Sequence, residues 1–478
     1  MKLFEPLDIN GMHLPNRVMV PAMVTHLCKE DGFVAPDTID RYVRYAKGGA
    51  GLIVVEAMAI HQVKSGPLLR ISDDRYIPGL RELTRRVHET SDSKIVPQII
   101  HFMKVARSGW RQTADTLALQ DIDRIVEQFG DAVARAREAG FDGAELHSAH
   151  AYTLSSFLSR CNPRKDEYGG KTLEDRLRLI GRVIASVRGK AGRDFPLGVR
   201  FNVEEFIKGG YTSQESKLIA QRLAEMGVDY LSLSAGGKFE DAVHQPGQVL
   251  YPYSGYSGER CMPGDWLPPA LHINPAAEVK AHLRANGHHV PMAIAGKLSD
   301  PNDAERVVAE GKADMVGIAR GLLADPDWPN KVKAGALERI VKCDYCNVCK
   351  ALDGTHRTVV CTLWPQGAIQ ASSEQPSLAA PAWPQDEAAL TARMKDSRVE
   401  LNWAKAAGAS YYEVYRIDPR GEAQMVDAVK VTSWLDELAL AGRTYRYFVR
   451  PYALAGRPGF RSATVDIEVP APSYATAA

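Results

Sequence analysis

Four cysteines in the second half of the chain have a spacing that suits metal binding. Cys343, Cys346 and Cys349 follow a Cys-x-x-Cys-x-x-Cys pattern, and Cys361 comes after eleven further residues. Structural zinc sites usually pair their ligands two and two, whereas three closely spaced thiolates with a distant fourth are typical of iron–sulfur loops. The spacing predicts an iron–sulfur cluster, with a [4Fe–4S] cubane as the expected type. A zinc ion and unliganded thiols are the alternatives.

Two histidines and a tyrosine lie close together at the end of an expected strand in the first third of the chain. His147, His150 and Tyr152 stand within six residues. Imidazole N–H groups can donate hydrogen bonds to a developing oxyanion, and a phenol can deliver a proton. A packed or surface histidine is the alternative for either ring. As a trio at the end of an expected strand, the three are the candidate catalytic residues.

Other polar residues that follow apolar runs could hold a flavin. The amide of Gln98 can both donate and accept hydrogen bonds, which suits the flavin pyrimidine edge. Arg200 could place a fixed cation where negative charge gathers when a flavin is reduced. Lys297 and Arg320 stand in short glycine-bearing segments that could bind a phosphate. A solvated glutamine, a structural ion pair and ordinary turns are the corresponding alternatives.

The elements that would position these residues alternate along the first 335 residues. Short β-branched or apolar runs are each followed by a longer helical pattern, as in βα repeats. The expected strands are 18–23, 51–56, 94–100, 143–147, 197–201, 230–234, 291–295 and 315–318. The expected helices are 37–47, 78–91, 121–139, 173–188, 213–226, 275–285, 300–310 and 327–334. This pattern predicts an α/β protein built on a (β/α)8 TIM barrel, with its active site where the strands end. An open doubly wound sheet is the alternative, but no G-x-G-x-x-G follows the first strand.

The C-terminal part differs from the barrel in composition and in the pattern of its apolar residues. We expect the barrel over 1–335, an iron–sulfur segment over 336–367, a polar, proline-bearing linker over 368–390 and a small all-β sandwich over 391–472. This tail resembles a fibronectin type III domain, because Trp403 stands in an early strand and Tyr445 would be its tyrosine-corner residue. Such modules usually mediate contacts, so no chemistry is expected of the tail.

Composition narrows the function classes. The formal net charge is +1, so no sequence-wide field attracts nucleic acid or an anionic membrane. No stretch approaches the roughly 18 unbroken apolar residues of a membrane span. The remaining cysteines, Cys28, Cys161 and Cys261, are scattered, unlike a secreted disulfide framework. We therefore expect a soluble cytoplasmic protein that acts on a small molecule.

Several motifs together resemble the old yellow enzyme family over about residues 1–365, in particular its iron–sulfur branch, which includes 2,4-dienoyl-CoA reductases and trimethylamine dehydrogenase. They are NRVMVPAM at 16–23, the His147-x-x-His150-x-Tyr152 group, FLS at 157–159 with N-x-R-x-D-x-YGG at 162–170, AD at 313–314 with LADPDWP at 323–329, and the cysteine loop.

The resemblance implies a flavin oxidoreductase that holds FMN without a covalent bond. In the family, a hydride passes from flavin N5 to the β-carbon of an activated alkene while a tyrosine protonates the α-carbon. By that match His147 and His150 would hold the carbonyl oxygen of the substrate, and Tyr152 would be the proton donor. The positions expected to contact FMN are Pro21, Ala22, Met23, Val24, Ala57, Gln98, Arg200, Gly296, Lys297, Ala319 and Arg320.

Departures from the family pattern refine this expectation. Amine dehydrogenases of the branch carry Tyr where His147 stands, so the histidine pair favours alkene reduction over the alternative, N-methyl amine oxidation that passes electrons through the cluster. Dienoyl-CoA reductases have a histidine soon after the sixth strand, where this chain reads Gly237-Lys238, so a dienoyl-CoA substrate is not favoured. Substitution by His244, which lies outside the residues that the structure describes, is the alternative. A third hypothesis, a barrel scaffold for an adhesion module, is disfavoured by the strand-end residues.

The source of electrons is also left open by the sequence. Iron–sulfur members usually continue into nucleotide-binding domains, and no such glycine fingerprint occurs in this sequence. Either NADH or NADPH would reduce FMN directly at the barrel, or an external electron-transfer protein would deliver electrons through the cluster. Association with a second copy of the chain into a homo-oligomer is likewise open.

Overall fold

The structure is a computed structural model that describes residues 1–63, 66–105, 110–238, 241–242, 253–372, 380–385, 389–417, 421, 423–453 and 458–471. The chain forms two compact units. The first comprises Met1–Lys342 with His356–Val359, and the second comprises Cys343–Thr355 with Val360–Ala478. The domain boundaries expected at 335, 367 and 390 remain a prediction.

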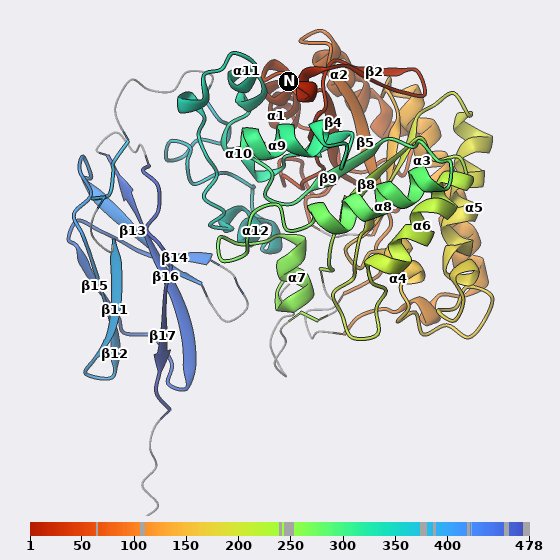
Figure 1. Ribbon diagram of the computed structural model, residues 1–478. Coiled ribbons are helices and arrows are strands. Elements are labelled where there is room, and N and C mark those ends of the chain that lie inside the picture. Colours follow the sequence, from red (N-terminus) through yellow and green to blue (C-terminus); the bar gives the residue numbers. More distant parts are fainter. Residues whose placement is uncertain are drawn as a thin grey trace, which may run out of the picture. The chain divides into compact units, whose positions relative to one another are not determined.

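Eight parallel strands close into a barrel in the first unit (Figure 1), in the order β10-β3-β4-β5-β6-β7-β8-β9. Their bounds are Val18–Val20 (β3), Leu52–Ala59 (β4), Lys94–Ile100 (β5), Ala144–Ser148 (β6), Leu197–Asn202 (β7), Tyr230–Ser234 (β8), Met292–Ala295 (β9) and Met315–Gly317 (β10). Each corresponds to an expected strand, which confirms the TIM barrel and rules out the open doubly wound sheet. A short hairpin of β1 (Leu7–Ile9) and β2 (Met12–Leu14) precedes the barrel.

Helices follow the strands and surround the barrel (Figure 1). Those that match the expected ones are α1 (Pro36–Lys47), α2 (Ile77–His88), α3 (Leu119–Glu138), α5 (Leu173–Ala191), α6 (Ser213–Glu225), α8 (Ile273–Ala285), α9 (Pro301–Ala309) and α11 (Trp328–Lys333). Shorter helices that sequence periodicity did not predict are α4 (Thr153–Leu158), α7 (Gly255–Cys261), α10 (Arg320–Ala324) and the 3-10 turns η1 (Lys2–Phe4), η2 (Asp74–Tyr76), η3 (Ala114–Thr116) and η4 (Leu337–Arg339).

The strands are buried on both faces, as expected for a parallel barrel covered by helices. Outward-facing Ile53 and Val55 of β4 belong to the main apolar core, together with Leu80 and Leu83 of α2. Because side chains alternate along a strand, the residues between them face the barrel interior. One face of β4 therefore packs against the helices, and its other face lines the barrel interior.

The second unit holds helix α12 (Val348–Gly354) and two antiparallel sheets. One sheet has the order β11 (Leu390–Lys395), β12 (Arg398–Trp403), β15 (Ser433–Asp436). The other has the order β14 (Ala423–Val429), β13 (Tyr411–Ile417), β16 (Arg443–Tyr452), β17 (Val465–Val469). The two sheets share one apolar core to which Trp403 and Val414 contribute. This confirms the expected all-β sandwich.

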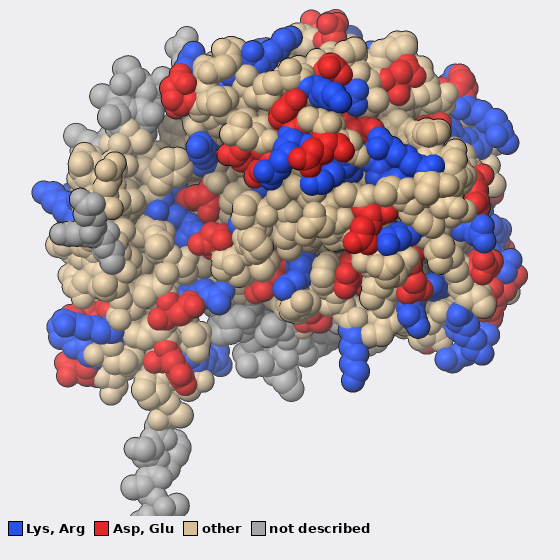
Figure 2. All heavy atoms as spheres, in the orientation of Figure 1, with Lys and Arg blue, Asp and Glu red and all other residues tan. Residues whose placement is uncertain are grey.

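Acidic and basic side chains are interspersed over the visible surface (Figure 2), in keeping with the nearly balanced charge of the chain. Within the described ranges, every helix is too short or too polar to cross a membrane.

Candidate active site

The interior of the barrel is apolar at one end and polar at the other. At the N-terminal ends of the strands, Ile9 and Met12 of the hairpin pack against Leu52 and Val96. Further along β5, β6, β7 and β8 the side chains become polar, with Gln98, His147, Arg200 and Ser232. Active sites of such barrels form at the C-terminal ends of the strands, so this polar end is the candidate site.

The register of the barrel sets these polar residues beside one another. Gln98 is paired with Glu145 on β6, and His147 is paired with Arg200 on β7. Arg200 is in turn paired with Ser232 on β8. Three consecutive strands thus bring a histidine, an arginine and a serine to one level of the barrel.

A buried carboxylate links several of these side chains. Glu145 is fully buried and accepts a hydrogen bond from Nε2 of Gln98 at 2.7 Å and one from the hydroxyl of Tyr230 at 3.3 Å. Burial raises the pKa of Glu145, and the charge of Arg200 opposes that shift. Sequence reasoning missed Glu145, although an acidic residue inside an apolar strand was a visible signal.

His147 is held as a neutral ring. The N–H of Ala149 donates to Nδ1 of His147 at 3.2 Å, which leaves the proton of the neutral ring on Nε2. Burial, followed by the charges of Arg200 and Lys238, keeps the pKa of His147 well below its usual value. His147 therefore offers one N–H donor and no positive charge.

His150 lies beside it in a turn with the left-handed φ of 58°. Its Nε2 shares a hydrogen bond of 2.6 Å with Oγ of Ser234, which also accepts from Nη2 of Arg200 at 3.3 Å. Burial and then His147 keep the pKa of His150 well below its usual value. The ring centroids of His147 and His150 are 5.1 Å apart.

Tyr152 completes the group from the N-terminus of α4. Its ring centroid lies 4.8 Å from that of His147. Its side chain is half-buried, and within the described part of the chain its hydroxyl has no hydrogen-bond partner. Nζ of Lys238 lies 5.9 Å from its ring centroid, a neighbour that sequence analysis did not assign to the site. The structure thus brings together all three candidate catalytic residues.

The loop after β3 carries four of the expected flavin residues. Pro21 is buried, whereas the next three residues, 22–24, are partly exposed. Buried Glu56 fixes the following residue, because its carboxylate accepts the N–H of Thr25 at 2.8 Å and the hydroxyl of Thr25 at 2.6 Å. Ala57, another expected flavin residue, follows Glu56 at an irregularity in β4 and is buried.

The expected phosphate residues meet at one turn. Nζ of Lys297 donates to the carbonyl oxygen of Gly264 at 2.9 Å, and Nη1 of Arg320 donates to that of Pro263 at 2.8 Å. Gly296 has a φ of 134°, and a Cβ there would lie 2.7 Å from Cδ2 of His272. Ala319 precedes the first residue of α10. The structure gathers the two cations but gives both of them backbone carbonyls as partners.

The four cysteines of the loop lie in the second unit and are not in disulfides. Burial, and then the neighbouring thiols led by Cys343, keep the pKa of Cys361 well above its usual value. Left-handed backbone at Tyr345 and Asn347 turns the chain between the first three cysteines. The N–H of Tyr345 donates to Sγ of Cys343 at 3.4 Å. The four thiols therefore lie near one another, with Cys346 buried and the other three partly exposed.

Thiolate ligands are arranged differently around a cluster and around a single metal ion. All ligands of one zinc ion lie within about 2.3 Å of the metal, whereas each thiolate of a cubane binds a different iron. No three His, Cys, Asp or Glu side chains in the described ranges converge as ligands of a single ion. The cluster and the zinc ion that the cysteine spacing allows both remain predictions.

A groove of about 450 Å³ is unrelated to these groups. It is lined by the 10–12 turn, Lys94, Asp142 and 194–196. Lys94 begins β5, Asp142 stands two residues before β6, and Pro196 immediately precedes β7. The groove therefore lies at the N-terminal end of the barrel, where such barrels do not place their chemistry.

Comparison with known proteins identifies the family. Residues 2–250 and 270–338 match the NADH:flavin oxidoreductase / NADH oxidase family. The chain belongs to this family. Membership confirms the resemblance to the old yellow enzyme family and makes the protein a flavin-dependent oxidoreductase.

Several curated relatives have names that state different activities. An NADH oxidase of Thermoanaerobacter brockii is 35% identical over 367 residues, which are 72% of this chain and 53% of that protein. An N,N-dimethylglycine/sarcosine dehydrogenase of Chromohalobacter salexigens is 31% identical over 73% of this chain and 50% of its own length. A cinnamate reductase of Clostridium sporogenes is 28% identical over 76% of this chain and 57% of its own length. The chain therefore spans about half the length of these relatives.

Solved structures share the fold of this flavin oxidoreductase. A 2-naphthoyl-CoA reductase in complex with 2-naphthoyl-CoA superposes with a TM-score of 0.65 at 24% identity, covering 76% of this chain and 56% of that one.

Proposed function

We propose that this flavin oxidoreductase reduces the C=C bond of an α,β-unsaturated carbonyl compound or thioester. The observation that carries the proposal is the convergence of neutral His147 and His150 with Tyr152 at the polar end of the barrel. FMN, when bound, supplies a hydride from its N5 to the β-carbon of the alkene. The residues of the chain supply the oxyanion donors and the proton.

The histidine pair would hold the carbonyl oxygen of the substrate. Hydride addition at the β-carbon moves negative charge onto this oxygen, and pre-oriented N–H donors stabilise that charge. Nε2 of His147 is a donor on a neutral ring. Ser234 holds His150 in place and is itself bonded to Arg200.

Tyr152 would donate the proton to the α-carbon. Its hydroxyl is uncommitted among the described residues, and its ring packs against His147. Addition of one hydride and one proton converts the C=C bond to a saturated CH–CH bond. Lys238 beside the ring could help the phenol recover a proton from solvent after each turnover.

FMN would be held at the ends of six strands. Because Nε2 of Gln98 donates to Glu145, its Oε1 is left as an acceptor for the flavin pyrimidine edge. Arg200 would supply the cation near N1 and O2. Lys297 and Arg320 would pair with the phosphate of FMN. Both side chains already donate hydrogen bonds to backbone carbonyl oxygens, which carry a partial negative charge as the phosphate carries a full one. The remaining contacts would be Pro21, Ala22, Met23, Val24, Ala57, Gly296 and Ala319.

Cys343, Cys346, Cys349 and Cys361 would hold a [4Fe–4S] cluster that passes electrons to or from FMN. Val359 stands two residues before Cys361, and its N–H donates to the carbonyl oxygen of Thr25 at 2.9 Å. Residues 356–359, which belong to the first unit, therefore precede Cys361 directly in the sequence. NADH, NADPH or an external electron-transfer protein would be the reductant.

We also propose that the sandwich is a fibronectin type III-like module. Its strand order, three strands facing four, is shared by that class of domain. The N–H of Leu440 donates to the hydroxyl of Tyr445 at 3.0 Å, which is the hydrogen bond of a tyrosine corner. Cytoplasmic location and a small-molecule substrate complete the proposal.

A second candidate is oxidation of an N-methylated amine, which the relationship to the dimethylglycine/sarcosine dehydrogenase favours. The two functions separate in one anaerobic comparison. Oxidised protein is mixed with N-methylated amines, and chemically reduced protein is mixed with conjugated enones and thioesters. Flavin reoxidation by an enone supports alkene reduction. Flavin bleaching by an amine, with no reoxidation by any enone, would reverse the ranking.

A further inference from the structure

In the second unit, the C-terminal half of β16 is buried on both faces of its sheet. On β16, Tyr447 and Val449 point into the core of the sandwich. Phe448, Arg450 and Tyr452 alternate with them, so they point to the opposite face, yet all three are buried and Arg450 is 0% exposed. Antiparallel sheets in sandwiches usually leave that outer face to solvent. In this unit, part of the chain covers it.

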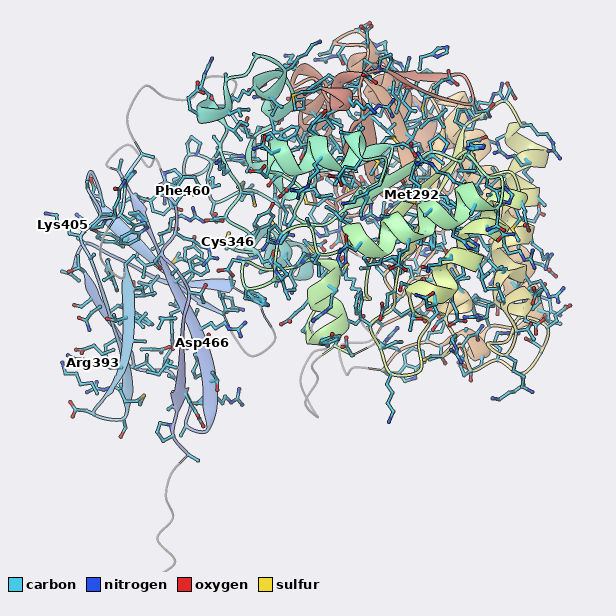
Figure 3. The ribbon with its side chains drawn as sticks, viewed as in Figure 1. Met292, Cys346, Arg393, Lys405, Phe460 and Asp466 are labelled. Atoms are coloured by element: carbon cyan, nitrogen blue, oxygen red, sulfur yellow. The ribbon has the colours of Figure 1, made fainter. Side chains whose placement is uncertain are left out.

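The covering segment is the cysteine loop itself. Nη2 of Arg450 binds Oδ2 of Asp344 at 2.6 Å. Asp344 stands between Cys343 and Cys346, the first two predicted cluster ligands. Figure 3 shows Cys346 beside this sheet. Gln366 follows Cys361 in the sequence, and its Oε1 accepts a hydrogen bond from the hydroxyl of Tyr411 of β13 at 3.1 Å.

A second arginine strengthens this attachment. Nη2 of Arg461 donates to the backbone oxygen of Asp344 at 3.4 Å, and its Nε lies 3.8 Å from the carboxylate. The guanidinium of Arg461 also stacks 4.7 Å above the ring centroid of Phe448. Two buried cations thus fix the side chain and the backbone of one residue in the cysteine loop. Arg450 and Arg461 both lie against the carboxylate of Asp344. Removing these three charges from water costs free energy, so their burial indicates that the position of Asp344 matters.

The carboxylate also shapes the loop directly. Oδ1 of Asp344 accepts the N–H of Cys346 at 3.3 Å. Asp344 therefore connects the guanidinium of Arg450 with the backbone of Cys346, a predicted cluster ligand. Because the pair is buried, its charges are poorly screened by solvent and act on their surroundings more strongly than surface charges do.

We propose that the sandwich is a structural part of the redox centre, in which Arg450 is a positioning residue that acts through Asp344 on the cluster and sets its reduction potential. This inference rests on the proposed [4Fe–4S] cluster. A cation near the cluster favours the added negative charge of its reduced form and raises the potential, whereas an anion lowers it.

The test is an anaerobic redox titration of the full chain, monitored by the paramagnetic signal of the reduced cluster. Arg450→Gln should favour the oxidised cluster by about tenfold, which is about 59 mV for one electron. Asp344→Asn should shift the potential in the opposite direction. Arg450→Lys keeps the charge and should stay near the wild-type potential. Arg446→Gln, on the same strand in the exposed pair with Asp466, is the matched control.

The outcomes separate this inference from the proposed function. A wild-type chain without iron removes the proposed cluster, and this inference falls with it. A wild-type cluster whose potential is unmoved by Arg450→Gln and Asp344→Asn, or moved in the same direction by both, overturns this inference alone. If Arg450→Gln loses its iron, the test uses Asp344→Asn, in which a neutral amide replaces the buried carboxylate. The inference then requires that the reduction potential of Asp344→Asn be higher than that of the wild type.

Discussion

Replacement of Tyr152 by phenylalanine tests the assigned proton donor with little structural disturbance. The change removes one hydroxyl that has no hydrogen-bond partner among the described residues, and it keeps the ring that packs 4.8 Å from His147. We therefore expect the free energy of unfolding to change by less than about 0.5 kcal/mol. Loss of a general acid usually slows proton transfer about 10²- to 10⁴-fold, or about 3 to 5 kcal/mol in the barrier.

The assay separates the two half-reactions by stopped-flow absorbance of the flavin. Reduction of the flavin should proceed at the wild-type rate in Tyr152→Phe, because the phenol takes no part in it. Reoxidation by a conjugated enone should slow by the factor given above. Tyr256→Phe is the control, since Tyr256 is 59% exposed. Equal slowing of both half-reactions, or unchanged reoxidation, would refute the role given to Tyr152.

Three further predictions follow from buried groups. Burial lowers the pKa of His61 to about 4, below its usual value of about 6.5. Between these two values the ring stays neutral in the folded protein but takes up a proton in the unfolded chain. The free energy of unfolding should therefore fall by about 3 kcal/mol as the pH is lowered from about 6.5 to about 4. His61→Gln should flatten the pH dependence of urea unfolding over this interval, and an unchanged slope would contradict the assignment. Glu56→Gln leaves one of the two Thr25 donors poorly paired, so the free energy of unfolding should fall by about 1 to 3 kcal/mol and the flavin content of the purified protein should drop. Exposed Glu82→Gln is its control, and full flavin retention in Glu56→Gln would count against the flavin role of the β3 loop. Cys361→Ser should lose iron while keeping flavin, unlike Cys161→Ser at an exposed thiol, and iron retained in full by Cys361→Ser would exclude it as a ligand.

The sequence predicted those features of the barrel that depend on neighbours along the chain. All eight strands were expected from apolar runs, and the candidate catalytic residues stood out because His147, His150 and Tyr152 lie within six residues. Short helices such as α4 were not expected, because six residues carry too little periodicity to detect.

Features that depend on the register between strands were out of reach. The contacts of Ser234 with both His150 and Arg200 require closure of the barrel, since Ser234 is 84 residues from His150. The bond between Arg450 and Asp344 spans 106 residues and joins segments expected to be separate. The tail was therefore assigned no part in the chemistry, although its arginines hold the cysteine loop.

A single turnover without oxygen tests the central claim most directly. The full chain, carrying its flavin in the reduced state, is mixed with one equivalent of a conjugated enone, and both flavin absorbance and organic product are measured. Alkene reduction predicts an oxidised flavin and one equivalent of the saturated carbonyl compound. A flavin that stays reduced, with the enone recovered unchanged across a series of enones and thioesters, would contradict it.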